Sequence, residues 1–260
     1  IALPSMLERG YDKNMALGVI NTGGGWGILI PPSILMILYA LITGVSVGQM
    51  FAAGIMPGIL LMVLTAIYIL VRCHLQPELA PALPKEERGT WPEKLRALRA
   101  VLLPIGVVVM VLGSIIGGIT TPTEAAAMGV LGALISAAVY KQFKWSILRE
   151  AAIRTFKLTG MIMWILFAAH AFSAAYQSMG AQELIEGLMN MVPGGPWGII
   201  IAMMVIVFLL AMVLDPVGIM LITLPVFMPI AESLGFDPIW FGILFVINME
   251  IGYMTPPFGF

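Results

Sequence analysis

The chain has 260 residues, of which 60% are hydrophobic and 10% are charged, and its formal net charge is −1. This composition is too apolar for a soluble domain of the same length and indicates a membrane protein. The small net charge argues against nucleic acid as a partner, and the single cysteine, Cys73, excludes a disulfide within the chain.

The first elements of the chain are bounded by charges, glycines and prolines. Residues 1–9 are expected to be the end of a helix whose beginning lies outside the chain, so that the chain is a fragment of a larger membrane protein. Residues 13–43 are apolar, but the glycines at 23–25 and the pair Pro31-Pro32 interrupt them. We therefore expect two half-helices with an unwound middle.

The middle of the chain is predicted to alternate membrane spans with polar or amphipathic segments. A span needs about 20 apolar residues to cross the hydrocarbon, whereas basic and apolar residues that alternate at helical spacing suit a helix in the membrane interface. The expected elements are a span over 50–72, a cytoplasmic polar loop over 75–100, spans over 101–118 and 122–140, an interfacial helix over 142–157, a span over 158–178 and a second interfacial helix over 181–192.

The last part of the chain begins with two apolar segments over 196–234, separated by a short Leu-Asp-Pro link at Asp215. A re-entrant hairpin with its tip at Asp215 fits this pattern, and so do two full crossings joined by the link. A further apolar helix over 238–260 is expected to be broken near Pro256 and the proline after it.

One long pattern occurs twice, since P-x5-G-[Tyr/Phe]-D-x14-G-x3-P-P fits residues 4–32 and again residues 229–257. The first copy carries Arg9 and Lys13 around its Gly-Tyr-Asp turn, whereas the second carries Glu232 and no basic residue. All Lys and Arg residues fall in three patches, which the positive-inside rule places on the cytoplasmic face. The two copies then begin on opposite faces of the membrane, as in the inverted repeats of secondary transporters.

Helix breaks inside a membrane leave backbone N–H and C=O groups unpaired, at a cost of several kcal/mol each if they face lipid. A ligand is expected to fill such a break, because carbonyls at a helix C-terminus coordinate cations and N-termini attract anions. Hard oxygen ligands favour Na⁺ over a transition metal. A proline kink made for packing would explain one break, but two breaks at matched positions favour a binding site. The residues at the breaks are Asn21, Thr22, Gly23, Gly24, Gly25 and Gly27 in the first, and Asn248, Glu250, Gly252 and Thr255 in the second.

Three acidic residues, Glu124, Asp215 and Glu250, lie away from every basic patch, and carboxylates inside a membrane are functional candidates. Asp215 is the best candidate for a Na⁺ ligand, although Asp-Pro also caps helices, and Glu250 can bond backbone amides instead of an ion. For Glu124, which follows Thr-Thr-Pro-Thr, capping of the next helix is the favoured interpretation. The sequence has no motif for nucleophilic catalysis, metal chemistry or phosphate binding, so an enzyme is not expected.

Four segments follow one another along the chain: GYDKNMALGVINTGGGWGILIPPSI, GGITTPTEAAAMG, MVLDPVGIMLITLPVFMPIAESLGFDP and NMEIGYMTPPFGF. Together they strongly resemble the large membrane subunit of tripartite ATP-independent periplasmic (TRAP) transporters, over essentially the whole chain. The resemblance implies an all-α polytopic membrane protein, an inverted-repeat elevator-type transporter with re-entrant hairpins and broken helices. It also implies Na⁺ coupling, the bacterial inner membrane, a small membrane subunit that is separate or fused, and a periplasmic solute-binding protein that delivers an organic acid.

On this resemblance the chain divides between a mobile transport domain and a scaffold. Residues 1–44 belong to the first repeat of the transport domain, residues 45–180 are mainly scaffold, and residues 181–260 form the second repeat. Trp26 stands where a small or hydroxyl residue is expected, so no side-chain ligand is expected there. The implied substrate contacts are Asn21, Thr22, Gly25, Thr255 and Pro256, and the implied Na⁺ ligands are Gly23, Gly24, Gly27, Asp215, Asn248 and Gly252.

Two other functions fit the same sequence features. One is a stand-alone Na⁺/anion symporter of the same superfamily, which would need no binding protein. The other is a channel or a structural membrane subunit, which would lack saturable, Na⁺-dependent counterflow.

Overall fold

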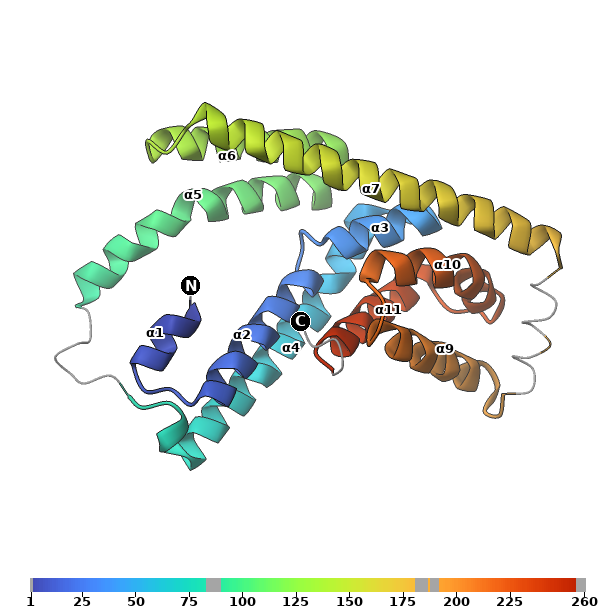
Figure 1. Cartoon of the computed structure of the whole chain (residues 1–260), viewed down its shortest axis with the longest axis horizontal. Coiled ribbons are helices and arrows are strands. Elements are labelled where there is room, and N and C mark those ends of the chain that lie inside the picture. The colour runs from blue at the N-terminus through green and yellow to red at the C-terminus, as the bar shows by residue number, and fades with distance from the viewer. Residues whose placement is uncertain (1, 83–89, 181–186, 188–191, 256–260) are drawn as a thin grey trace. The chain divides into compact units, whose positions relative to one another are not determined.

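The computed structural model describes residues 2–82, 90–180, 187 and 192–255, and these residues contain helices and turns but no β-strand (Figure 1). Among these residues, five helical segments are long and apolar enough to cross a membrane. The chain is therefore an all-α polytopic membrane protein, as predicted. The five segments are Lys13–Thr43, Val47–Leu75, Pro122–Val139, Trp145–Ala168 and Pro216–Ser233.

The chain folds into two compact units, each made of two segments of sequence. The first unit contains Ile1–Pro32 and Gly54–Gln142, and the second contains Ser33–Ala53 and Phe143–Phe260. The boundaries of these units differ from those expected for a transport domain and a scaffold, and that functional division stays a prediction. The first unit holds α1 (Ala2–Glu8), α2 (Lys13–Leu29), most of α4 (Val47–Leu75), the 3₁₀ turn η1 (Pro77–Leu79), α5 (Trp91–Ile116) and α6 (Pro122–Val139).

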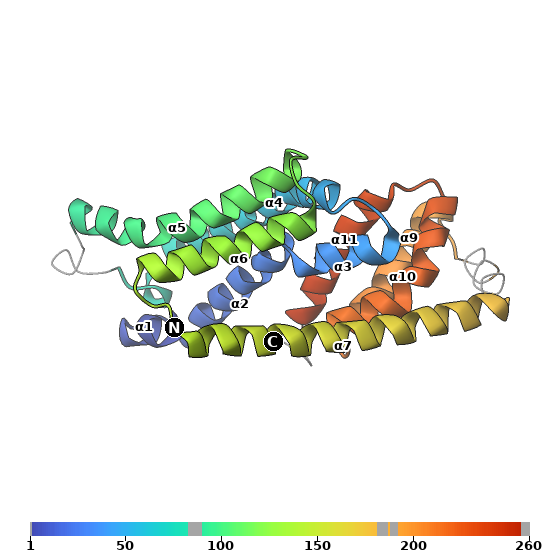
Figure 2. The same cartoon turned by 90° about the horizontal axis from the view of Figure 1, so that it is seen from above.

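In the first unit, a short turn joins α5 to α6, as the sequence predicted, and the two helices lie side by side (Figure 2). Glycines on α6 allow this close approach, since a Cβ at Gly132 would lie 2.7 Å from a methyl group of Val107. The start of α5 was not predicted, because residues 91–100 were expected to belong to the polar loop. Thr90 and Glu93 form a capping box there, with the Thr90 amide donating to Glu93 Oε2 at 2.8 Å.

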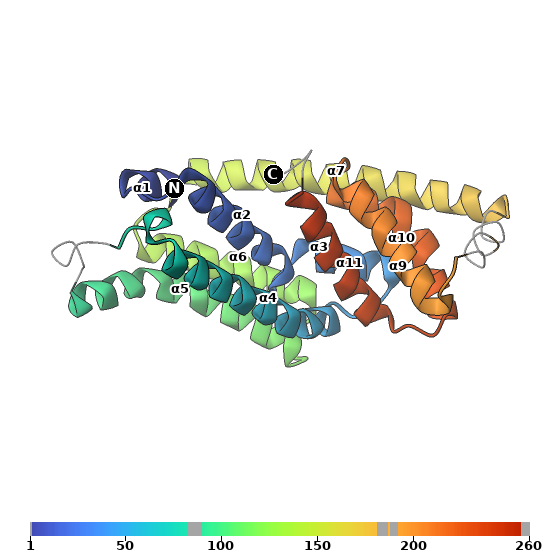
Figure 3. The same cartoon turned by 90° about the horizontal axis from the view of Figure 1, so that it is seen from below.

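The second unit is built around α10 (Pro216–Ser233), which is apolar on all sides and therefore suits a buried position. It packs against α3 (Ile34–Thr43), α7 (Trp145–Ser178), α9 (Gly195–Ala211) and α11 (Pro238–Tyr253). Figure 3 shows α9, α10 and α11 beside one another. The two helices predicted within 196–234 are present, joined by the turn that contains Asp215.

One long helix, α7, replaces the two elements expected between residues 142 and 178. The boundary expected at residue 157 is wrong, because this region has no proline and only Gly160 to weaken the helix. A glycine costs about 1 kcal/mol relative to alanine, which is less than the cost of unpaired backbone groups in an apolar medium. The second interfacial helix, expected over 181–192, falls almost entirely outside the described residues.

Close packing of α3 on α11 depends on Gly242. The Tyr39 hydroxyl donates to the Pro238 carbonyl at 2.7 Å, and this hydrogen bond holds the Tyr39 ring over the Gly242 backbone. A Cβ at Gly242 would lie only 2.5 Å from the ring and 2.9 Å from the Met50 methyl group. Only glycine fits this position without moving a neighbour.

We predict that Gly242→Leu lowers the stability of the protein by about 1–3 kcal/mol, the usual cost of overpacking a filled interior. The measurement is thermal unfolding of the purified protein in detergent. Gly160→Leu is the matched control, because a Cβ at this helical glycine meets no atom within 4 Å. Equal losses in the two variants would contradict the packing role of Gly242.

Candidate functional site

The two copies of the Gly-[Tyr/Phe]-Asp motif adopt the same backbone structure. Gly10 and Gly235 have positive φ angles, +78° and +85°, which glycine adopts without strain. The amides of Tyr11 and Phe236 each donate to the carbonyl five residues earlier, at 3.1 and 3.0 Å. This hydrogen bond across a left-handed glycine is the Schellman arrangement that ends a helix.

The aspartate of each motif begins the next helix. Asp12 Oδ1 accepts from the Met15 amide at 2.9 Å at the start of α2. Asp237 Oδ1 accepts from the amides of Ile239 and Trp240, at 2.9 and 2.8 Å, at the start of α11. Each motif is therefore a C-cap joined directly to an N-cap, and the repeat found in the sequence is also a repeat of local structure.

The first break lies at the prolines alone, and the unwinding expected at the three adjacent glycines is wrong. The helix α2 runs unbroken from Lys13 to Leu29, so it includes every first-repeat candidate from Asn21 to Gly27. The Thr22 hydroxyl donates within this helix, to the Gly18 carbonyl at 2.7 Å. Three glycines cost about 3 kcal/mol relative to alanine, but unwinding them would leave several backbone groups unpaired at a similar or larger cost each.

The helix ends where proline removes its hydrogen-bond donors. The Ile30 amide donates to the Trp26 carbonyl at 2.9 Å, and it is the last amide of this series. Pro31 and Pro32 have no N–H, so the carbonyls of Gly27 and Ile28 lack the donor four residues later that a helix supplies. Of the three glycines assigned to Na⁺, Gly27 is the one whose carbonyl is left without a helical partner.

The helix α3 begins immediately after the break. Ser33 is its N-cap and is almost fully buried, and its hydroxyl oxygen accepts from the Met36 amide at 3.3 Å. The first break is therefore short and has a carbonyl-rich end before it and a capped helix start after it.

The second break was expected within the sequence from Asn248 to Pro256, but α11 is continuous through Tyr253. The Thr255 hydroxyl donates to the Ile251 carbonyl at 2.7 Å, in the turn that follows the helix. Pro256 lies outside the described residues, so the structure gives no account of its role. The positions expected to be unwound are thus helical up to Tyr253.

Two Na⁺ candidates on α11 pack against α9. Asn248 Nδ2 donates to the Met204 carbonyl at 2.6 Å, and this hydrogen bond joins the two helices. A Cβ at Gly252 would overlap the Ala211 side chain, so glycine is needed there for the close approach of the helices. The structure therefore brings these two candidates to one helix interface and gives each a packing role.

Asp215 and Glu124 both cap helices. Asp215 Oδ2 accepts from the Gly218 amide at 3.0 Å at the start of α10. Glu124 Oε2 accepts from the Thr121 amide at 2.8 Å, which confirms the capping interpretation of this residue. The cap accounts for an aspartate at position 215 without an ion, and its role as a Na⁺ ligand stays a prediction.

Glu250 differs from the other carboxylates because it is buried and has no hydrogen-bond partner. The residue is 3% exposed, and neither carboxylate oxygen bonds to any residue that the structure describes. The Tyr253 hydroxyl, one helical turn later, is also buried and unpartnered within the described part of the chain. Sequence reasoning missed Tyr253, although its spacing of three residues from Glu250 places both side chains on one face of α11.

Comparison with known proteins gives the family of the chain. The family model described as "Tripartite ATP-independent periplasmic transporter, DctM component" matches residues 1–260. The chain is 36% identical over 257 residues to the ectoine TRAP transporter large permease protein of Halomonas elongata, covering 98% of this chain and 59% of that protein. It is 36% identical over 262 residues to the C4-dicarboxylate TRAP transporter large permease protein of Pseudomonas aeruginosa, covering 100% of this chain and 60% of that protein.

A third relative is the 2,3-diketo-L-gulonate TRAP transporter large permease protein of Escherichia coli, 30% identical over 267 residues, with 100% of this chain and 60% of that protein covered. The chain thus spans about three fifths of the length of the curated relatives that it matches. The match over its whole length, together with its all-helical membrane fold, means that the chain belongs to the DctM component family of tripartite ATP-independent periplasmic transporters.

Proposed function

We propose that the complete protein is the large permease of a TRAP transporter and takes up a small organic acid by Na⁺-coupled secondary transport. Family membership supports transport as the function. Two of the relatives named above transport carboxylates according to their names, a C4-dicarboxylate and a diketogulonate. The substrate class of this protein is accordingly a small carboxylate.

The observation that carries the Na⁺ proposal is the end of α2 at Pro31 and Pro32. The carbonyls of Gly27 and Ile28 have no helical donor there, and the C-terminal end of a helix carries partial negative charge. Unpaired carbonyl oxygens of this kind are hard ligands that suit Na⁺. Bound Na⁺ would supply positive charge beside the substrate carboxylate.

The candidate ligands thus have oxygen atoms of the kind that suits Na⁺, but they differ in whether those oxygens are already in hydrogen bonds. Gly23 and Gly24 keep their carbonyls in helical hydrogen bonds, so Gly27 is the better ligand of the first repeat. In the second repeat, Glu250 offers carboxylate oxygens that no described residue occupies. Asp215 remains a proposed ligand from the turn between α9 and α10.

Partners and mechanism follow from the family. We propose a small membrane subunit, separate or fused, a periplasmic solute-binding protein that delivers the substrate, and a location in the bacterial inner membrane. The proposed mechanism is an elevator, in which the transport domain slides against the scaffold and carries Na⁺ and substrate together.

Uptake in proteoliposomes tests the transport proposal. The protein, its small subunit and its solute-binding protein are reconstituted, and uptake of a labelled C4-dicarboxylate, ectoine and 2,3-diketo-L-gulonate is measured in NaCl and in choline chloride. We expect uptake of at least one acid in NaCl, and loss of that uptake in choline chloride or without the binding protein. Equal uptake in the two salts would exclude Na⁺ coupling, and uptake without the binding protein would indicate a stand-alone symporter.

The double variant Pro31→Ala/Pro32→Ala tests the Na⁺ site at the end of α2. It restores two N–H donors that can pair with the Gly27 and Ile28 carbonyls, so we expect Na⁺ affinity to fall at least tenfold. Affinity is read from the rise in unfolding temperature with NaCl concentration, since a ligand that binds the folded state stabilises it. Pro57→Ala is the matched control, because Pro57 lies inside α4. An unchanged NaCl dependence in the double variant would place Na⁺ elsewhere.

Two substitutions at Asp215 separate its cap from a role as ligand. Asp215→Ala removes the cap and is expected to cost about 1 kcal/mol of stability, whereas Asp215→Ser keeps a capping oxygen and should cost only a few tenths. A Na⁺ ligand would lose its charge in both variants, so both should lower the Na⁺ affinity measured as above. If Asp215→Ser binds Na⁺ like the wild type, Asp215 is a cap alone.

A further inference from the structure

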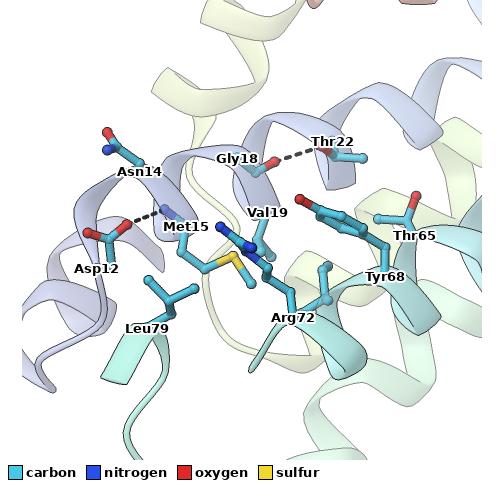
Figure 4. A pocket seen from close by; sticks show the side chains of 11 residues that line it. Asp12, Asn14, Met15, Gly18, Val19, Thr22, Thr65, Tyr68, Arg72 and Leu79 are labelled. Carbon is cyan, nitrogen blue, oxygen red and sulfur yellow. Dashed lines mark hydrogen bonds between the residues drawn. The ribbon is translucent and has the colours of Figure 1, made fainter. Parts of the chain in front are cut away.

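The first unit contains a cavity of about 470 Å³ between α2 and α4 (Figure 4). One wall comes from the first half of α2, through Asn14, Met15 and Val19, and the opposite wall from the second half of α4, through Thr65, Tyr68 and Arg72. The sequence positions on each helix repeat at intervals of three or four, so each wall is one helix face.

Two contacts hold the helices around this cavity. At one end of the cavity, the Asp12 amide donates to the Leu79 carbonyl at 3.0 Å, which ties the start of α2 to the segment after α4. Toward the other end of α2, Gly58 of α4 lies against Ile30, where a Cβ would come within 2.9 Å of the Ile30 side chain. Small side chains between these points, such as Gly18 and Thr22, leave the space unfilled.

The cavity is rich in hydrogen-bond donors. Arg72 makes no ion pair with any residue that the structure describes, although Asp12 lines the same cavity. Asp12 already accepts from the Met15 amide and lies at the positive N-terminal end of α2. Figure 4 shows the Arg72 guanidinium and the Tyr68 hydroxyl directed toward the space beside α2. A guanidinium with a neighbouring hydroxyl donor matches a group with several anionic oxygens, above all a phosphate.

The surroundings of the cavity are apolar. The span α4 is strongly apolar, and little of its most apolar stretch is buried within the described part of the protein. Leu60, Leu64 and Leu70 are each more than half exposed along it, which is the surface that acyl chains cover. Arg72 lies in the last turn of this helix, the depth at which a membrane span meets the headgroups.

We propose that this cavity binds the phosphate group of a phospholipid headgroup. Arg72 and Tyr68 donate to the phosphate oxygens, Thr65 lies on the same face of α4, and the acyl chains run along the exposed leucines of α4. Binding pockets of this kind between membrane helices commonly hold anionic headgroups. The lipid would join α2 to α4 and so fix the helix that ends at the Pro31-Pro32 break.

Native mass spectrometry of the delipidated full-length protein, titrated with phosphatidylglycerol, tests the proposal. We expect Arg72→Gln to weaken lipid binding about tenfold, because a charge-assisted hydrogen bond is lost. Arg149→Gln, which removes an exposed arginine of α7, should bind lipid like the wild type. Equal lipid binding in these two variants would overturn the proposal.

A second pair of variants tests the cavity without changing charge. Thr65→Phe fills the cavity and should abolish binding, whereas Leu131→Phe, at an exposed position of α6, should not. Equal effects of the two substitutions would overturn the assignment. Inorganic phosphate at millimolar concentration should leave the lipid bound, and displacement by phosphate as effective as by lipid would instead assign the cavity to a free anion.

Discussion

An unpaired backbone N–H or C=O group costs several kcal/mol where no water reaches it, and this cost decides where the helices of the chain begin and end. Side chains satisfy the amides at most helix starts described here, with Asp12, Ser33, Asp215 and Asp237 each accepting from an amide two or three residues later. Where no side chain or water can pair the groups, the helix simply continues. Left-handed glycines end the helices before the two Gly-[Tyr/Phe]-Asp motifs, and the proline pair at 31–32, which cannot donate, ends α2.

The same constraint explains which parts of the fold the sequence could predict. Spans bounded by proline, by charges or by a capping motif were located correctly, as for α4, α6 and the pair α9 and α10. The three errors of continuity, in α2, α7 and α11, came from weighing glycine, the sequence repeat and amphipathic pattern above the hydrogen bonds of a helix in an apolar medium. The start of α5 was missed although Thr90 and Glu93 have the spacing of a capping box.

The candidate site was less predictable, because its residues acquire their roles from partners far away in the sequence. Asn248 bonds to the Met204 carbonyl, and Gly252 fits against Ala211, and neither contact follows from a local pattern. The repeat located the two Gly-[Tyr/Phe]-Asp motifs, but their aspartates proved to be caps. A conspicuous residue in a membrane sequence can therefore be fully explained by backbone hydrogen bonding, and the informative ones are those, such as Glu250, that this bonding leaves unexplained.

The two copies of the repeat share a turn and then diverge in packing. Within the described residues, α2 buries only Ala16 and Leu29, and its C-terminal half is rich in glycine, whereas α11 buries bulky residues such as Phe241, Phe245 and Met249. Buried apolar area stabilises by roughly 25 cal/mol per Å², so α11 is held by its neighbours, while α2 relies mainly on its own hydrogen bonds. A helix held in this way is stable where the bonds are complete and weakest where they stop, at the carbonyls of Gly27 and Ile28. A positive charge that pairs with those carbonyls would thus stabilise the part of the repeat that packing against neighbouring helices does not stabilise.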